Sequence, residues 1–229
     1  MRHFSSQVSL LDLLPEPLEA TVVELNSRFG SGTAIGICTD VTNSKQLQNA
    51  FERSTEFGGG RLDIVINNAG IATPGLEKAK AAVLVNLLAV IEGTKLGMEI
   101  MQRLHPREGG CIVNVASYAA CVRVPFSAVY AATKSGVLHF SRSLKYLASE
   151  NIRVAALCPS FADTPMVRLS MGMPAQAAEG IATGESVSSA VAALGTLMTA
   201  RHVAKQMLRL IKDPELAGEG LVVTPRGTY

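Results

Sequence analysis

Three side chains in the second half of the chain have the types and the spacing of a proton-transfer site. Tyr130 and Lys134 are four residues apart in a segment with helical periodicity, so they share one helix face. Ser117 follows the apolar run CIVNV, at the end of an expected strand. A phenol that acts as a base near pH 7 needs a pKa about 3 units below its usual value, a shift of about 4 kcal/mol. A nearby ammonium favours the phenolate, and the serine hydroxyl can hold a substrate oxygen.

Strand-like and helix-like segments alternate along the whole chain, and these elements must position that site. The strands are continuous apolar runs, which are typical of a parallel sheet covered on both faces. The alternation predicts a Rossmann-like, doubly wound α/β fold, whose ligands bind beyond the carboxyl ends of the strands. Asp12, Asp40, Asn67 and Ser117 stand at or just past those ends. The expected strands are Gln7–Asp12, Thr33–Cys38, Leu62–Ile66, Cys111–Val115, Ile152–Leu157 and Leu221–Val223, and the expected helices are Leu18–Phe29, Ser44–Phe57 (capped by Thr42 or Asn43), Glu77–Leu104, Ser127–Glu150 and Arg201–Ile211.

Composition narrows the class of protein. The 229 residues suit one α/β domain over residues 1–229, and 48% hydrophobic with 17% charged residues predicts a sizeable core. A net charge of +2 gives no electrostatic reason to expect nucleic acid or an acidic membrane surface. We find no apolar run of the roughly 18 residues that a membrane helix needs and no signal peptide. The four histidines lack metal-ligand spacing. The four cysteines form no CxxC pair, which predicts buried free thiols and a cytoplasmic protein.

The order of these motifs resembles the short-chain dehydrogenase/reductase family from about Gln7 to Val223. Ser117 followed by YAATK at Tyr130 resembles the family's active site. Further matches are the NNAG motif at 67–70, Asn86 in VLVNLLAVIEGT, Asp40-Val41, and CPSFADTP at 158–165, which carries Ser160 where the family usually has glycine. Asp12, the segment VNLLAVIEGTKLGMEIM and the short tail after Val223 resemble the 15-hydroxyprostaglandin dehydrogenase-like branch.

The resemblance implies a role for each matching residue. Tyr130 would be the general acid/base, and Lys134 would lower its pKa and bind the nicotinamide ribose. Ser117 would orient the carbinol or carbonyl, and Asn86 would hold a water that joins Lys134 to a proton relay. The implied activity is hydride transfer between a nicotinamide cofactor and a small secondary alcohol or ketone. The implied cofactor-binding positions are Asp12, Asp40, Val41, Asn67, Ala69, Gly70, Tyr130, Lys134, Pro159 and Thr164.

Asp12 favours NAD over NADP as the cofactor. In the family, an acidic residue at this position accepts hydrogen bonds from the adenosine ribose hydroxyls, and a 2′-phosphate would face like charge there. The alternative interpretation is that Asp12 caps the helix that begins near Pro15.

The chain departs from the family at its front. The family begins with a strand, a TGxxxGxG loop that approaches the pyrophosphate, and a helix. Here Gln7–Asp12 matches the family's second strand, so about 30 residues, the size of a βα unit, are absent. The family's first strand lies in mid-sheet in the order 3-2-1-4-5-6-7. Its absence should leave its two neighbouring strands unpaired on the facing edges, unless Gln7–Asp12 shifts into the vacant slot. The domain is therefore expected to be N-terminally incomplete, as a piece of a longer product or as a rearranged fold.

Two functions remain open. The first is an NAD-dependent oxidoreductase, and the alternative is a non-catalytic Rossmann-like binding or interaction protein that has lost dinucleotide binding, as the missing loop indicates. Family members pair through two long helices, here 77–104 and 127–150, which predicts a homodimer or homotetramer. The segment 165–199 would select the substrate, and its sequence does not name one.

Overall fold

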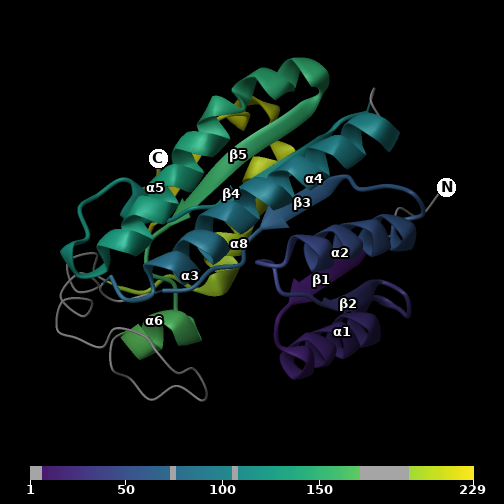
Figure 1. The fold of residues 1–229 in the computed structure, drawn as a ribbon, viewed down its shortest axis with the longest axis horizontal. Coiled ribbons are helices and arrows are strands. Elements are labelled where there is room, and N and C mark those ends of the chain that lie inside the picture. Colours follow the sequence, from purple (N-terminus) through teal and green to yellow (C-terminus); the bar gives the residue numbers. More distant parts are fainter. Residues whose placement is uncertain (1–6, 73–75, 105–107, 171–195) are drawn as a thin grey trace.

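The computed structural model describes residues 7–72, 76–104, 108–170 and 196–229, and it has helices on both faces of parallel strands (Figure 1). The strands form two sheets, one with the order β1-β2 and one with the order β3-β4-β5-β6-β7. All pairs are parallel except β6 with β7, a short antiparallel pair that the sequence did not predict. The strands are β1 (Val8–Asp12), β2 (Ala34–Cys38), β3 (Ile64–Asn67), β4 (Gly110–Val115), β5 (Ile152–Pro159), β6 (Gly220–Thr224) and β7 (Gly227–Thr228).

The break between the two sheets falls where the sequence predicts a vacant position. β1 pairs with β2 over its whole length, from Val8 opposite Ala34 to Asp12 opposite Cys38, and among the described strands β3 pairs only with β4. β1 and β3 are therefore the two unpaired neighbours that we expected. The alternative, in which Gln7–Asp12 shifts beside β3, is wrong: α1 packs its buried Leu18 against Gly36 of β2 and holds β2 beside β1.

The helices start within three residues of the predicted segments, and all but α5 also end within one residue of them. α2 begins after Asn43, whose Oδ1 accepts hydrogen bonds from the backbone N–H groups of Lys45 (3.1 Å) and Gln46 (3.2 Å), so the predicted cap is confirmed. Figure 1 shows α4 and α5 in front of the larger sheet and α8 behind it. The helices are α1 (Pro15–Phe29), α2 (Ser44–Phe57), α3 (Ala79–Val83), α4 (Ala89–Leu104), α5 (Ala128–Ser143), α6 (Pro165–Ser170) and α8 (Ala200–Lys212).

Two long helices differ from their predicted form. The helix expected over Glu77–Leu104 is divided into α3 and α4 by a π-helical turn, Leu84–Leu88, with Asn86 at its centre. Such turns are rare and are often found at functional sites. The helix expected over Ser127–Glu150 ends at Ser143 and continues as a 3-10 helix, Lys145–Glu150. Hydrophobic periodicity does not distinguish these helix types, because their side-chain spacing differs by less than one residue per turn.

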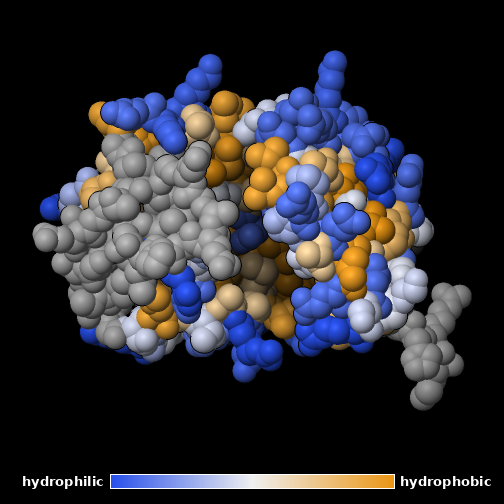
Figure 2. Space-filling view, turned by 90° about the horizontal axis from the view of Figure 1, so that it is seen from below, coloured by the Kyte–Doolittle hydropathy of each residue, from blue (hydrophilic) through white to orange (hydrophobic). Residues whose placement is uncertain are grey.

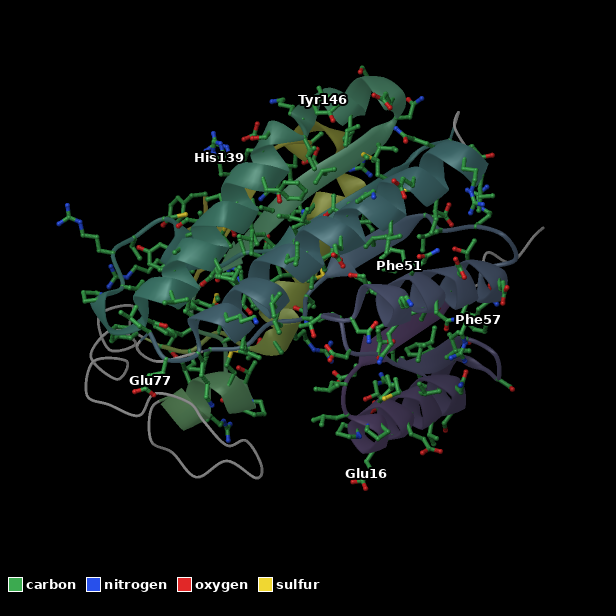
Figure 3. The ribbon with its side chains drawn as sticks, viewed as in Figure 1. Glu16, Phe51, Phe57, Glu77, His139 and Tyr146 are labelled. Atoms are coloured by element: carbon green, nitrogen blue, oxygen red, sulfur yellow. The ribbon has the colours of Figure 1, made fainter. Side chains whose placement is uncertain are left out.

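The largest core cluster joins the two sheets on one face. Leu47 and Phe51 of α2 pack with Val65 of β3 and Met101 of α4, and Leu11 of β1 packs against the same cluster. Figure 3 shows Phe51 between α2 and α4. α2 therefore spans the break between β1 and β3 and holds the two sheets in one layer.

The apolar stretch Ala79–Leu104 also belongs to this layer. Its 26 residues are long and apolar enough to cross a membrane by length and composition, which holds for no other helix among the described residues. Its α4 part packs against β3 and β4 with Val90, Ile100 and Met101 buried, and core packing accounts for its composition.

The prediction for the cysteines is correct in part. All four are free thiols, but only Cys111 and Cys158 are buried, and Cys38 and Cys121 are exposed. Cys38 ends an outer strand, β2, and Cys121 follows a short 3-10 helix, so tertiary neighbours do not cover them.

Candidate active site

The ends of β4 and α5 bring together the three side chains that the sequence singled out. β4 ends at Val115, and Ser117 then caps a 3-10 helix, Tyr118–Ala120, where its Oγ accepts a hydrogen bond from the Ala119 N–H (3.1 Å). Tyr130 lies in the first turn of α5 and forms a hydrogen bond with Ser117. The serine and the phenol are therefore in direct contact, as a shared substrate-oxygen site requires.

Lys134 is buried behind this pair, with 3% of its surface exposed. Its Nζ donates a hydrogen bond to the carbonyl oxygen of Val115 (2.7 Å) and lies 5.9 Å from the centre of the Tyr130 ring. Burial lowers the pKa of Lys134 to about 8, and the nearby thiol of Cys158 opposes this slightly. One ammonium in a nearly dry position therefore faces the phenol.

Burial also acts on the phenol. It raises the pKa of Tyr130, and the hydrogen bond from Ser117 acts in the opposite direction. The Lys134 ammonium donates to Val115 and not to the phenol oxygen, so the lowering of the Tyr130 pKa by Lys134 stays a prediction.

Asn86 lies in the π-helical turn and is fully buried. Its Oδ1 accepts from the Ile71 N–H (2.8 Å) and its Nδ2 donates to the Ile71 carbonyl (2.9 Å). The side chain thereby fixes the loop that follows β3, which contains Ala69 and Gly70. A Cβ atom on Gly70 would lie 3.5 Å from Asn86 Oδ1 and 3.6 Å from Lys134 Nζ. Gly70 therefore lies beside both polar side chains, and the water-holding role of Asn86 stays a prediction.

Asn67, predicted to lie near a cofactor, makes its hydrogen bonds inside the core. Its Nδ2 donates to Asn114 Oδ1 (2.8 Å) and to Thr94 Oγ1 (3.1 Å). Asn114 is fully buried, and its Nδ2 donates to Ser141 Oγ (3.0 Å). This network fastens the end of β3 to β4, α4 and α5. The sequence carried one signal that we did not use, an asparagine inside the apolar run CIVNV.

The residues predicted for the adenosine end lie at the ends of β1 and β2. Asp40 Oδ1 accepts from Thr42 Oγ1 (2.7 Å) and the Thr42 N–H (2.9 Å), and these hydrogen bonds lower the pKa of Asp40. Val41 is partly buried against the core cluster. Asp12 is exposed, and its Oδ1 accepts from the Leu14 N–H (2.9 Å) just before α1. Leu14 is the N-cap of α1 and no side chain caps the helix, so the capping interpretation of Asp12 is wrong, and the other carboxylate oxygen of Asp12 is left for a ligand.

The end of β5 forms the remaining wall of the site. Pro159 is its last residue, and Ser160 N–H donates to the Val223 carbonyl (2.8 Å), so serine is accommodated in this turn. Thr164 Oγ1 donates to the Ala162 carbonyl (3.3 Å) in front of α6. Residues 171–195, most of the segment predicted to select the substrate, lie outside the described residues.

The described side chains fit two of the three parts of a nicotinamide dinucleotide. The site of Ser117, Tyr130 and Lys134 fits the nicotinamide and its ribose, because it offers two hydroxyls and one ammonium beside Gly70. Asp12 and Asp40 fit the adenosine end. Over residues 7–72, where β1 to β3 lie, we find no glycine-rich turn that leads into a helix and could approach a pyrophosphate.

The described part of the chain contains no cluster of three or more metal-ligating side chains. His139 projects outward from α5 (Figure 3), and His202 is exposed on α8. His3 and His105 lie outside the described residues.

Comparisons with known proteins agree with this geometry. The family model "short chain dehydrogenase" matches residues 5–173. The 15-hydroxyprostaglandin dehydrogenase [NAD(+)] of Mus musculus is 29% identical over 96% of this chain and 81% of the mouse protein. The cis-4-hydroxycyclohexanecarboxylate dehydrogenase of Sinomonas cyclohexanicum is 31% identical over 86% of this chain and 76% of the Sinomonas protein. The crystal structure of an actinorhodin polyketide ketoreductase variant with NADPH is similar to this structure with a TM-score of 0.81 and 27% sequence identity. The match covers 95% of this chain and 86% of the ketoreductase chain.

Proposed function

The chain belongs to the short-chain dehydrogenase family, and from this premise we propose that it uses Ser117, Tyr130 and Lys134 to oxidise a secondary alcohol or to reduce the corresponding ketone. The observation that carries the proposal is the contact of Ser117 with Tyr130 beside the buried ammonium of Lys134. Relatives named as dehydrogenases and a ketoreductase support an NAD(P)-dependent oxidoreductase, and they give no support to the non-catalytic alternative.

Each side chain has a distinct task in this reaction. The bound nicotinamide would accept a hydride from the carbinol carbon or give one to the carbonyl carbon. Tyr130 takes the hydroxyl proton in oxidation and returns it to the carbonyl oxygen in reduction. The Ser117 hydroxyl holds the same oxygen, and its hydrogen bond to Tyr130 favours the phenolate. Lys134 supplies a positive charge, and its attraction for the phenolate strengthens as water is excluded.

We favour NAD as the cofactor because Asp12 places a carboxylate at the end of β1, where a 2′-phosphate would meet like charge. The name of the mouse relative includes NAD(+), whereas the ketoreductase was crystallised with NADPH. Titration of the chain with NADH and with NADPH, followed by fluorescence and by thermal shift, separates the two. Tighter binding of NADPH, or an Asp12→Asn variant with an unchanged preference, would contradict this choice.

The decisive experiment measures turnover of secondary alcohols with NAD, and of ketones with NADH, for the wild type and for Tyr130→Phe. Loss of the proton-transferring hydroxyl should lower kcat by about 100-fold or more, with little change in NADH affinity. Tyr146→Phe is the matched control, because Tyr146 is 61% exposed in the 3-10 helix that follows α5 (Figure 3) and should behave as wild type. Unchanged turnover in Tyr130→Phe removes Tyr130 from this role, and no NADH binding at millimolar concentration contradicts the proposal for the 229-residue chain.

We also propose that the protein is cytoplasmic, which its four free thiols support. We propose that it forms a homo-oligomer, because Leu88 (41%) and Leu104 (41%) are exposed along the helical segment 77–104 that is predicted to pair. Light scattering after size exclusion tests the assembly, and a monomer at micromolar concentration would refute it. Fractionation of cells that express a tagged chain tests the location.

A further inference from the structure

Two of the four cysteines lie in contact beside the candidate active site. Ala116 N–H donates to the Leu157 carbonyl (2.8 Å), so the segment that leaves β4 runs along the end of β5. Ser117 and Cys158 are the next residues of the two segments, and the backbone of Ser117 forms a hydrogen bond with the Cys158 thiol. The 3-10 helix that Ser117 caps also contacts β5, and Cys121 is its last capping residue. A side-chain hydrogen bond joins the thiols of Cys121 and Cys158.

The two thiols differ in their freedom to move. Cys158 is fully buried among Val90 and Val137, and β5 is paired on one side with β4 and on the other with β6. Cys121 is exposed, and its N–H donates to the Tyr118 carbonyl (2.9 Å). A disulfide bond is about 2.05 Å long, so two sulfurs in hydrogen-bonding contact must still approach each other. The exposed turn at Cys121 supplies that movement, because the strand that carries Cys158 is held along both edges.

The surroundings also decide which thiol reacts first. Burial raises the pKa of Cys158 to about 12, and the charge and the hydrogen bond of Cys121 act in the same direction. Ser117 and the Lys134 ammonium act in the opposite direction. Cys158 therefore keeps its proton at neutral pH and, being fully buried, is shielded from dissolved oxidants. Once Cys121 is oxidised, its negative charge is gone, and Ser117 and Lys134 then favour the Cys158 thiolate.

The other two cysteines lie away from this pair. Cys111 lies opposite Arg153, near the start of β5, whereas Cys158 is near its end. Cys38 is exposed at the end of β2, where its thiol donates to the Leu13 carbonyl (3.5 Å). Figure 2 shows a hollow between the part of the molecule that contains β1 and β2 and the part that contains the larger sheet. Cys38 is therefore a reference thiol, exposed but distant from Cys158.

We propose that Cys121 and Cys158 are a redox pair, in which a hydroperoxide oxidises the exposed thiol and the buried thiol then closes a disulfide beside Ser117. The Cys121 thiolate attacks a peroxide oxygen, so that an S–O bond forms and the O–O bond breaks. The departing oxygen takes up the proton that Cys121 released and leaves as water or an alcohol. The Cys158 sulfur then attacks the Cys121 sulfur, so that the S–S bond forms and the S–O bond breaks, and the released hydroxide leaves with the Cys158 proton as water. Two electrons pass from the thiols to the peroxide, and a dithiol reductant returns them.

Closure of the disulfide would act on the candidate active site, a consequence that rests on the proposed function. The Ala120 N–H donates to the Ser117 carbonyl (2.9 Å), so the 3-10 helix moves with Cys121 as one unit. That movement draws the Ser117 hydroxyl away from Tyr130, with which it forms a hydrogen bond. Displacement of a substrate-holding group by about 1 Å costs about 100-fold in rate in unfavourable cases, so we expect the disulfide to lower kcat by about tenfold or more.

Mass spectrometry of the whole chain tests the pair without any measurement of turnover. The chain is treated with a small excess of hydrogen peroxide, and its free thiols are then blocked with N-ethylmaleimide in urea. We expect a mass lower by two hydrogens before blocking, with Cys38 and Cys111 blocked instead of all four thiols. Digestion should give one cross-linked pair of peptides that contains Cys121 and Cys158. Dithiothreitol should make all four thiols available again.

Matched variants separate the pair from general oxidation. Cys121→Ser should form at least about tenfold less disulfide than the wild type, whereas Cys38→Ser, which removes the other exposed thiol, should form as much as the wild type. Cys158→Ala removes the second thiol, so the sulfenic acid of Cys121 should persist and react with dimedone. Both serine variants change exposed residues and should fold, so they decide the outcome even where Cys158→Ala does not fold.

Three outcomes would overturn the redox pair. The first is an equal loss of thiols in the wild type and in Cys121→Ser. The second is a cross-link between chains, whose yield rises with protein concentration. The third is a wild-type chain whose Cys121 is oxidised by peroxide without a cross-link to Cys158.

Turnover of a secondary alcohol decides the consequence for the site. The cross-linked wild type should lose about tenfold or more in kcat and recover it with dithiothreitol, while Cys121→Ser keeps its activity after the same peroxide treatment. Equal turnover with and without the cross-link would refute the effect on Ser117. A reduced chain without turnover would refute the proposed function alone, because the mass still reports the disulfide.

Discussion

The buried ammonium of Lys134 makes the stability of this protein depend on pH in a direction that the structure determines. Burial lowers the pKa of Lys134 from 10.5 to about 8. The unfolded chain therefore binds this proton more tightly than the folded chain, and the free energy of unfolding should rise with pH across the interval between the two values. The full difference of about 2.5 pH units corresponds to about 3.4 kcal/mol. From pH 7 to pH 9.5 the rise amounts to about 2 kcal/mol.

Urea unfolding followed by circular dichroism measures this rise when Lys134→Met serves as the reference. The difference between the free energies of unfolding of the wild type and the variant should rise by about 2 kcal/mol from pH 7 to pH 9.5. Burial raises the pKa of Cys158 to about 12, which lowers stability above pH 9, but this thiol is present in both proteins and largely cancels. The raised pKa of Tyr130 lowers stability only above pH 10. A difference that stays flat or falls with pH, at equal m-values, would refute the reasoning.

Three further substitutions test the packing around the site, each by urea unfolding. Asn114→Ala removes the acceptor of Asn67 and Thr94 in a fully buried network and should cost about 2–4 kcal/mol of stability; a loss below about 0.5 kcal/mol would contradict the network. Gly93→Ala places a methyl group on Asn67 Oδ1 and should cost about 1–3 kcal/mol, and wild-type stability would show that the asparagine moves away freely. Gly70→Ala meets only ordinary contacts and should keep the stability within about 0.5 kcal/mol but raise the KM for NADH, and an unchanged KM would remove Gly70 from the cofactor site.

Several features of the candidate site were accessible from the sequence. Tyr130 and Lys134 share a helix face because a turn of α5 has 3.6 residues, and Ser117 follows β4 because an apolar run ends there. Parallel strands place their carboxyl ends at one edge of the sheet. Family membership, predicted from ordered motifs, is confirmed by the family match over residues 5–173.

Other features depended on packing between segments that are distant in the sequence. The π-helical turn at Asn86, which fixes the loop after β3, has the same apolar periodicity as a plain helix. The exposure of Cys38 follows from the outer position of β2, which composition does not reveal.

The charge states at the site show the same dependence on tertiary structure. From the four-residue spacing we expected Lys134 to lower the pKa of Tyr130, but the ammonium donates to Val115, and burial acts on both groups. Desolvation depends on every atom around a side chain, and sequence spacing describes only neighbours on one helix.

The sequence by itself determined the order of the elements, the family and the three side chains of the site, because local periodicity and motif order are properties of the chain. Only the tertiary structure decided that β1 stays with β2 and leaves a slot beside β3. That outcome is a balance between the buried contacts of β1 with α1, β2 and α2 and the edges of β1 and β3 that have no strand partner among the described residues. Burial and hydrogen bonding between distant segments set such a balance, and no local pattern in the sequence encodes it.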